Sequence, residues 1–150
     1  MDRIVADVDA RGDAAVRHYA KAIDGVERSS MRVAREEIVA AYQHVPTSFV
    51  EHLRVAAARI ERYHRKQLRS SFLDVEGDCV LGQLVRPIGR VGLYAPGGRA
   101  AYPSSLIMAA VPAKVAGVPR LALATPAGRD GRVWPATLVA ADVAGVDEVY

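Results

Sequence analysis

Apolar residues recur every three or four positions in the first part of the chain, and the clearest run begins just after Pro46. Its apolar members are Phe49, Leu53, Ala56, Ala57, Ile60 and Tyr63. This spacing puts them on one face of a helix, and Pro46 suits its first turn. Shorter patterns of the same kind predict helices before Gly25 and a third helix over residues 35–44. Ala34 stands at the start of this third helix, so the helix lacks a capping hydroxyl. Residues 1–69 are therefore expected to be helical.

The pattern changes after residue 70. Short runs rich in branched residues, separated by turn-forming residues, predict strands over 72–75, 79–85, 91–95, 120–125 and 146–150. Helices are predicted over 105–116, with a kink or restart at Pro112, and over 135–144. From Val91 onward the order β-α-β-α-β predicts a parallel sheet with right-handed crossovers. The expected fold class is α/β, with N-terminal helices (1–69) followed by a partly parallel sheet flanked by helices (70–150).

Size and composition indicate a globular protein. The chain has 150 residues, 51% of them hydrophobic, and a mean hydropathy of +0.06, which excludes a disordered tail. No apolar run approaches the roughly 20 residues that a membrane span needs. The charged N-terminus has no apolar signal core. A soluble cytoplasmic protein that does not contact a membrane is expected.

Charge and cysteine content further narrow the kinds of partner and site that the chain could have. The net charge of +3 comes from an arginine excess, much of it between Arg54 and Arg69. Aromatic residues do not interleave with it, so a solvated helix face is favoured over a nucleic-acid interface, and no nucleic-acid partner is expected. Cys79 is the only cysteine, which excludes an internal disulfide and a cysteine-based zinc site. Its place in a strand-like run predicts a buried, inert thiol.

The segment after the strand at 91–95 is the best candidate for a binding site. Pro96-Gly97-Gly98 lets the backbone turn tightly and approach a ligand. Ser104 and Ser105 are expected to cap the next helix, whose N-terminus would favour an anionic group. Tyr94 falls at the carboxyl edge of the sheet, where its ring could stack on a base or ribose. A tight turn beside a core aromatic is the other interpretation. The loop does not match G-x-G-x-x-G or a P-loop.

Catalytic groups are sparse. The four histidines all fall in the helical region and none lies four residues from another; they are His18, His44, His52 and His64. Asp7 and Asp9 share no helix face, and no nucleophile-elbow motif occurs. We therefore assign no catalytic residue and no metal ligand within these 150 residues.

One long segment nevertheless resembles a known family. Residues 86–117, with Gly-Leu-Tyr-Ala-Pro-Gly-Gly at 92–98 and Val-Pro-Ala-Lys-Val-Ala-Gly at 111–117, closely resemble histidinol dehydrogenase. The resemblance continues through residues 10–16 and 138–150, and so covers almost the whole chain.

The resemblance implies an oxidoreductase that converts L-histidinol to L-histidine, the last step of histidine biosynthesis, in two successive NAD-dependent oxidations. Members of the family are zinc-dependent homodimers with incomplete Rossmann-like domains, so residues 70–150 are expected to form such a region. Of the family's NAD contacts, the motif tyrosine corresponds to Tyr94. Pro96 is a weaker candidate for cofactor binding.

The departures from the family are large. Its chain is much longer and usually starts earlier. Its Gln-x-x-His zinc motif, its other zinc ligands, its Glu-His pair and its substrate-binding serine would all follow Tyr150. The chain is therefore expected to be an N-terminal fragment that is inactive alone. Two alternatives stay open: a related NAD-dependent dehydrogenase of another small polar alcohol, and a stand-alone nucleotide-binding module.

Overall fold

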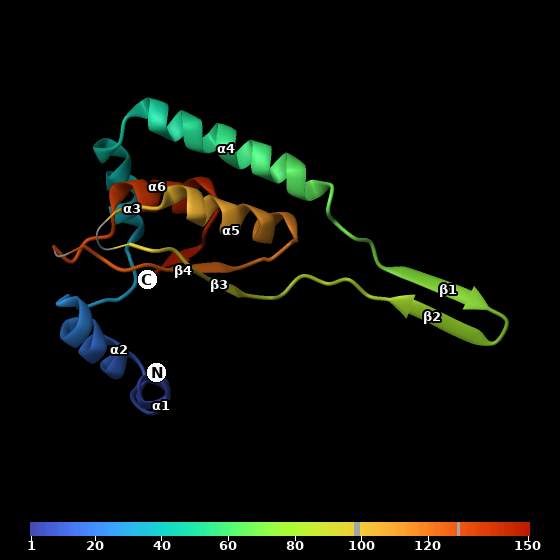
Figure 1. Cartoon of the computed structure of the whole chain (residues 1–150), viewed down its shortest axis with the longest axis horizontal. Coiled ribbons are helices and arrows are strands. Elements are labelled where there is room, and N and C mark those ends of the chain that lie inside the picture. The colour runs from blue at the N-terminus through green and yellow to red at the C-terminus, as the bar shows by residue number, and fades with distance from the viewer. Residues whose placement is uncertain (98–99, 129) are drawn as a thin grey trace.

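Three parallel strands form the centre of the protein, as seen in a computed structural model that describes residues 1–97, 100–128 and 130–150. The strands lie in the order β3-β4-β5 and are β3 (Val91–Tyr94), β4 (Leu121–Ala124) and β5 (Glu148–Val149). Helix α5 (Pro103–Val115) connects β3 to β4, and α6 (Pro135–Val143) connects β4 to β5 (Figure 1). Both strand pairs are parallel, which confirms the predicted β-α-β-α-β order and the α/β fold class.

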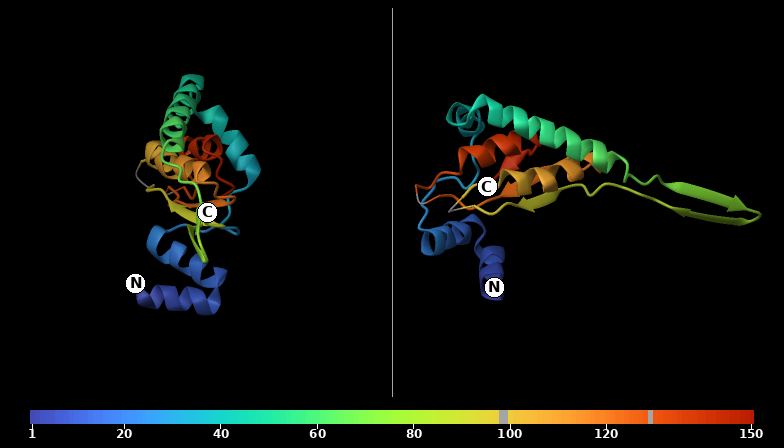
Figure 2. Two further views of the ribbon diagram at one scale, coloured as in Figure 1. Left: turned by 90° about the vertical axis from the view of Figure 1, so that its right-hand side faces the viewer. Right: turned by 45° about the horizontal axis from the view of Figure 1, so that its top comes forward.

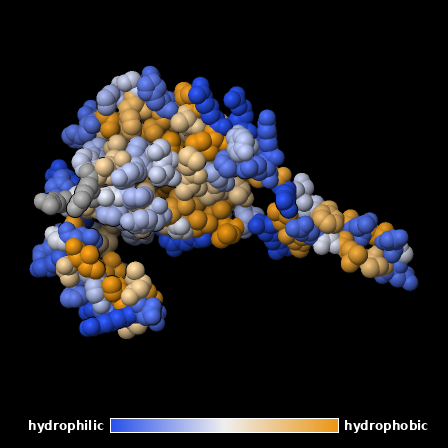
Figure 3. All heavy atoms as spheres, viewed as in Figure 1, coloured by the Kyte–Doolittle hydropathy of each residue, from blue (hydrophilic) through white to orange (hydrophobic). Residues whose placement is uncertain are grey.

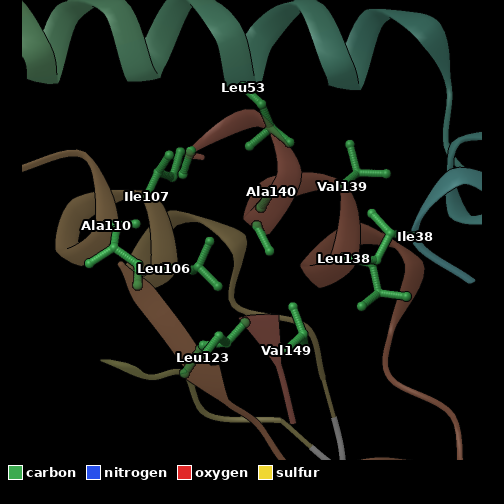
Figure 4. Close-up of a cluster of buried hydrophobic side chains, with 14 of the residues drawn as sticks. Ile38, Leu53, Leu106, Ile107, Ala110, Leu123, Leu138, Val139, Ala140 and Val149 are labelled. Carbon is green, nitrogen blue, oxygen red and sulfur yellow. The ribbon is translucent and has the colours of Figure 1, made fainter. Parts of the chain in front are cut away.

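Two layers of helices lie over one face of this sheet. Helices α5 and α6 pack side by side next to the strands, and α4 (Thr47–Arg65) crosses above both of them (Figures 1 and 2). Helix α3 (Arg35–Ala41) and the 3-10 turn η2 (Tyr42–His44) pack on α6. The hydrophobic core lies between these layers and joins α3 and α4 to the sheet (Figure 4). Its buried members include Leu53, Leu106, Ala110, Leu123, Val139 and Val149.

The N-terminal helices contribute little to that core. Helices α1 (Asp2–Arg11) and α2 (Asp13–Tyr19) continue into a π-helical turn, η1 (Ala20–Asp24), and pack mainly on each other. The predicted end at Gly25 is confirmed, since Gly25 adopts φ +70°. Within α1 no residue is buried. None of the described helices is long and apolar enough to cross a membrane.

A β-hairpin projects away from the body of the protein (Figures 1 and 2). Its strands β1 (Phe72–Glu76) and β2 (Cys79–Gln83) are antiparallel and turn at Gly77, where φ is +57°. Both strands were predicted. The prediction that Cys79 is buried is wrong, because its side chain is exposed. Every residue of the hairpin is exposed, including this thiol, because no layer of the described chain covers either face.

Prolines set the start of both crossover helices. Helix α5 begins at Pro103 and α6 at Pro135, each in the first turn, where a missing N–H costs nothing and φ is already helical. The prediction that Ser104 or Ser105 caps α5 is therefore wrong, since both lie inside its first turn and Tyr102 is the N-cap. Pro112 is accommodated within α5, which continues to Val115.

Candidate functional site

The carboxyl ends of β3 and β4 meet at one edge of the sheet. Tyr94 and Ala124, the last residues of these strands, are partners in the parallel register. The two loops that follow therefore leave the sheet side by side. In open α/β sheets this edge is where ligands bind, because loops diverge there and leave a crevice.

Gly97 brings the two loops into direct contact. A Cβ built on this glycine would lie 2.6 Å from the backbone carbonyl oxygen of Pro126 and 3.1 Å from the Thr125 Oγ1. No real side chain tolerates such a contact with a backbone atom, so only glycine fits. Gly97 is therefore needed for the close contact between the two loops, whereas the close approach of a ligand that the sequence suggested stays a prediction. Its neighbour Gly98 lies outside the described residues.

Tyr94 presents its ring to solvent at this edge. Val91 and Leu93 alternate with it along β3 and are half-buried toward the helices, whereas the Tyr94 side chain is 69% exposed. The interpretation of Tyr94 as a core aromatic is therefore wrong for the described chain. Pro96, two residues further on, is also exposed. The edge thus offers a planar aromatic surface beside a glycine-lined turn.

A cavity of about 700 Å³ lies beside the loop that follows β4. Its apolar wall comes from Ala40, Trp134 and Leu138, and its polar groups include His44, Asp130 and Arg132. Asp130 is held in place because its Oδ1 accepts the Arg132 backbone N–H at 3.1 Å. The sequence pattern does not indicate this cavity, because it forms only where α3 meets the start of α6 and the loop before it.

The most strongly connected ionisable groups tie helices together. Asp142 on α6 accepts hydrogen bonds from Arg35 and, at 2.7 Å, from the Tyr42 hydroxyl. Partial burial opposes ionisation of Asp142, but these two donors outweigh it and lower its pKa. Burial and the neighbouring carboxylate raise the pKa of Tyr42 to about 12. These groups are part of the α3–α6 packing, so we assign them a structural role.

The histidines stay apart in the folded chain. They lie on α2 (His18), on η2 (His44) and on α4 (His52 and His64). Within residues 1–97, 100–128 and 130–150, no group of three or more His, Cys, Asp or Glu side chains could hold a metal ion. The described part of the chain therefore offers a surface for a planar ligand but no metal centre.

Comparison with known proteins identifies the context of this site. The family model for histidinol dehydrogenase matches residues 1–150. A histidinol dehydrogenase from Moorella thermoacetica is 53% identical over 150 residues, covering 98% of this chain and 35% of the relative. One from Heliobacterium mobile is 51% identical over 151 residues, with coverages of 99% and 35%.

The fold agrees with these sequence matches. The crystal structure of histidinol dehydrogenase from Elizabethkingia anophelis superposes with a TM-score of 0.92 at 30% sequence identity, covering 99% of this chain and 34% of that structure. The chain thus spans about a third of the length of the relatives it matches. With a family model matched from end to end and the same arrangement of helices and strands in a solved relative, the chain belongs to the histidinol dehydrogenase family.

Proposed function

We propose that this chain forms part of an enzyme that oxidises L-histidinol to L-histidine with NAD. The observation that carries the proposal is its 53% identity to a relative named histidinol dehydrogenase across 98% of its own length. The proposed reaction takes an alcohol through an aldehyde to a carboxylic acid in two oxidations. NAD accepts a hydride in each, and a water molecule that adds to the aldehyde supplies the second carboxyl oxygen. We expect the enzyme to act in the cytoplasm, where a reducing environment preserves exposed thiols such as Cys79.

Tyr94 and Pro96 are the proposed cofactor contacts. An exposed aromatic ring at the carboxyl edge of a parallel sheet fits the adenine or ribose of a dinucleotide, since both present a flat or apolar face to stack on. Pro96 would extend that surface, and Gly97 lets the loop after β3 pack closely on Pro126 of the neighbouring loop, which holds this edge in place. In this proposal Tyr94 binds and orients the cofactor, and it takes no part in proton transfer.

Zinc fits the described residues poorly. They contain no cluster of three or more potential ligands, and zinc sites in enzymes use three protein ligands plus an open position. We propose that any zinc ligands, like the acid and base of the reaction, come from sequence other than these residues. We also propose that the working enzyme is a homodimer.

A chimeric enzyme tests the proposed activity. Residues 1–150 of this chain would replace the matching segment of the Moorella thermoacetica relative, and NADH formation from L-histidinol would be followed by absorbance. We expect turnover with histidinol and none with other small polar alcohols. A folded chimera that forms no NADH from histidinol would show that this segment cannot replace that of a histidinol dehydrogenase, and would contradict the proposal.

Substitution of Tyr94 in the same chimera tests the cofactor contact. Tyr94→Ala removes one aromatic contact worth about 1 kcal/mol, which corresponds to an increase of about fivefold in the KM for NAD. Tyr94→Phe keeps the ring and should leave this KM within about twofold of the parent. Zinc content and the KM for histidinol should not change in either variant. An unchanged KM for NAD in Tyr94→Ala would remove Tyr94 from the cofactor site.

A further inference from the structure

The cavity between α3 and the loop before α6 has no role in the function proposed above. Its volume of about 700 Å³ suits a small molecule, since ligand pockets range from about 300 to about 1,000 Å³. Exposed apolar side chains also occur elsewhere on the surface, for example along the β1–β2 hairpin (Figure 3). The cavity differs from those surfaces because it is concave and combines an apolar wall with groups of opposite charge.

The apolar wall of the cavity can receive a ring or a branched hydrocarbon chain. It is lined by Ala40 on α3, by Leu138 on α6 and by Trp134 at the start of α6. Leu138 is 5% exposed, whereas Trp134 is 41% exposed and can therefore contact a ligand. His44 adds a second ring on the α3 side. Apolar groups that leave water for such a surface gain stability, and aromatic pairs add to that gain.

Two opposite charges lie on one short turn at the rim of the cavity. Asp130 and Arg132 both line the cavity and are exposed, and they flank Gly131, which adopts φ +73°. The Arg132 backbone N–H donates to Asp130 Oδ1 at 3.1 Å, which fixes the two residues relative to each other. Among the described residues, neither the Asp130 carboxylate nor the Arg132 guanidinium forms an ion pair. Both charges are therefore open to a ligand.

Arg28 joins the two sides of the cavity. Its guanidinium donates to Glu37 Oε1 on α3 at 2.7 Å and to the Gly131 carbonyl oxygen at 3.3 Å. The Glu37 carboxylate is thereby engaged, which leaves Asp130 as the acidic group that a ligand can reach. Because one side chain holds both α3 and the turn, the walls keep their spacing without a ligand. A site formed in advance loses less entropy when it binds.

We propose that this cavity binds a free α-amino acid whose side chain is apolar or aromatic. The α-ammonium group of the ligand donates to the Asp130 carboxylate, its α-carboxylate accepts from the Arg132 guanidinium, and its side chain lies against Trp134 and Leu138. Charge-assisted hydrogen bonds of this kind are stronger than neutral ones. A zwitterion satisfies both charges at once, whereas an acid or an amine satisfies one of them. This inference does not depend on the reaction that the enzyme performs.

Trp134 can report binding directly, because it is the only tryptophan of the chain. The 150-residue chain would be titrated with L-phenylalanine, with hydrocinnamate, which lacks the ammonium group, and with phenethylamine, which lacks the carboxylate. Tryptophan fluorescence and calorimetry would measure the affinities. We expect saturable binding of L-phenylalanine and at least about tenfold weaker binding of each analogue, because each loses one charge-assisted contact. An analogue that binds as tightly as L-phenylalanine, or no saturable binding of the amino acid, would overturn the proposal.

Variants of the two charged residues test their roles separately. Arg132→Gln removes the positive charge, and Asp130→Asn removes the negative charge but keeps an acceptor for the Arg132 N–H. Each should weaken binding of L-phenylalanine at least about tenfold. Arg132→Gln should leave the affinity for phenethylamine within about twofold, and Asp130→Asn should do the same for hydrocinnamate. Arg59→Gln, at an exposed arginine of α4 outside the cavity, is the control. An equal loss in the control, or unchanged affinity in either cavity variant, would contradict the proposal.

A larger side chain at Ala40 tests where the ligand binds. Ala40 is exposed on α3 and lines the cavity, so Ala40→Leu fills the apolar side while both charged residues stay unchanged. We expect this variant to bind L-phenylalanine at least about tenfold more weakly than the parent, with an unchanged circular dichroism spectrum. Val39→Leu is the matched control, because Val39 is exposed on the same helix but does not line the cavity. Parent-like binding by a folded Ala40→Leu variant would show that the ligand binds elsewhere.

Discussion

At the scale of single residues, Glu37 compensates for the missing capping side chain at the start of α3. Ala34 cannot cap α3 with its side chain, but its backbone N–H donates to Glu37 Oε1 at 3.1 Å. Arg28 donates to the same carboxylate at 2.7 Å and ties it to the segment before the helix. Glu37 thus provides one half of a capping box and satisfies an N–H that would otherwise have no partner. The predicted weakness at Ala34 is offset by a residue three positions later.

Thr137 presents the opposite case, a buried polar group that the fold does not satisfy. It is 1% exposed, and its Oγ1 has no hydrogen-bond partner among the described residues. Thr137→Val replaces the hydroxyl with a methyl group of similar volume and should raise the free energy of unfolding by about 1 kcal/mol. Thermal denaturation would show this as an increase in Tm of about 2–4 °C. Thr137→Ala serves as the control and should lower stability, because it also removes a packed methyl group. A less stable Thr137→Val would indicate that the hydroxyl donates to a backbone carbonyl.

At the scale of elements, Asp147 joins a helix to the sheet just before β5. Its Oδ2 accepts the backbone N–H of Leu121 at 2.7 Å and pairs with Lys114 of α5 at 2.9 Å. The Leu121 N–H, followed by the Lys114 ammonium, lowers the pKa of Asp147. One carboxylate therefore holds the end of α5, the start of β4 and the approach to β5 together.

Removal of this carboxylate should be costly, because it leaves the N–H of a buried residue without an acceptor. We expect Asp147→Ala to lower the free energy of unfolding by about 1–2 kcal/mol, measured by urea denaturation. Asp147→Asn keeps an acceptor and should lose less. An Asp147→Ala variant as stable as the parent would show that water replaces the carboxylate at Leu121.

The Asp147 carboxylate also predicts how the free energy of unfolding changes with pH. Since the folded-state pKa of Asp147 lies below its ordinary value of 3.8, the unfolded chain binds more protons in this range. The stabilisation is fully present above about pH 4 and is lost as the pH falls through the folded-state pKa. The difference in stability between the parent and Asp147→Asn should therefore shrink on acidification from pH 5 toward pH 3. A difference that grows over that range would mean that the charge of Asp147 opposes folding.

At the scale of the whole molecule, one core joins the helical and the sheet regions. Leu53 of α4 and Ile38 of α3 belong to the same buried cluster as Leu123 and Val149 of the strands (Figure 4). The boundary that the sequence suggests between residues 69 and 70 stays a prediction. The structure does change just after this point, because the β1–β2 hairpin projects away from the rest of the protein (Figure 1).

The absence of a metal centre from the described residues gives a prediction for the chain as a whole. We expect the purified 150-residue chain to bind less than stoichiometric zinc and to form no NADH from histidinol, because the described residues provide no clustered ligands. Atomic absorption and an absorbance assay would measure both. The chimera described above is the positive control. Stoichiometric zinc or turnover by this chain would show that it carries a complete catalytic centre.

Local pattern was enough to predict most of the elements. Periodicity of apolar residues located α4, because side-chain burial repeats at 3.6 residues in a helix on the surface. Longer apolar runs located the two crossover helices, and short branched runs located the strands. The start of α6 at Pro135 was predicted correctly, and Pro103 shows the limit of this approach. Both helices begin at a proline in the first turn, and for α5 two serines suggested a start one or two residues later.

Tertiary structure alone decided which of these residues are buried and which meet. The sequence could not show that Gly97 touches Pro126, that α3 and α6 enclose a cavity, or that Asp147 reaches Leu121, because each contact joins segments distant in the chain. Cys79 illustrates the physical reason. Its strand was predicted correctly, but burial depends on what packs over a strand, and over the hairpin the described chain places nothing.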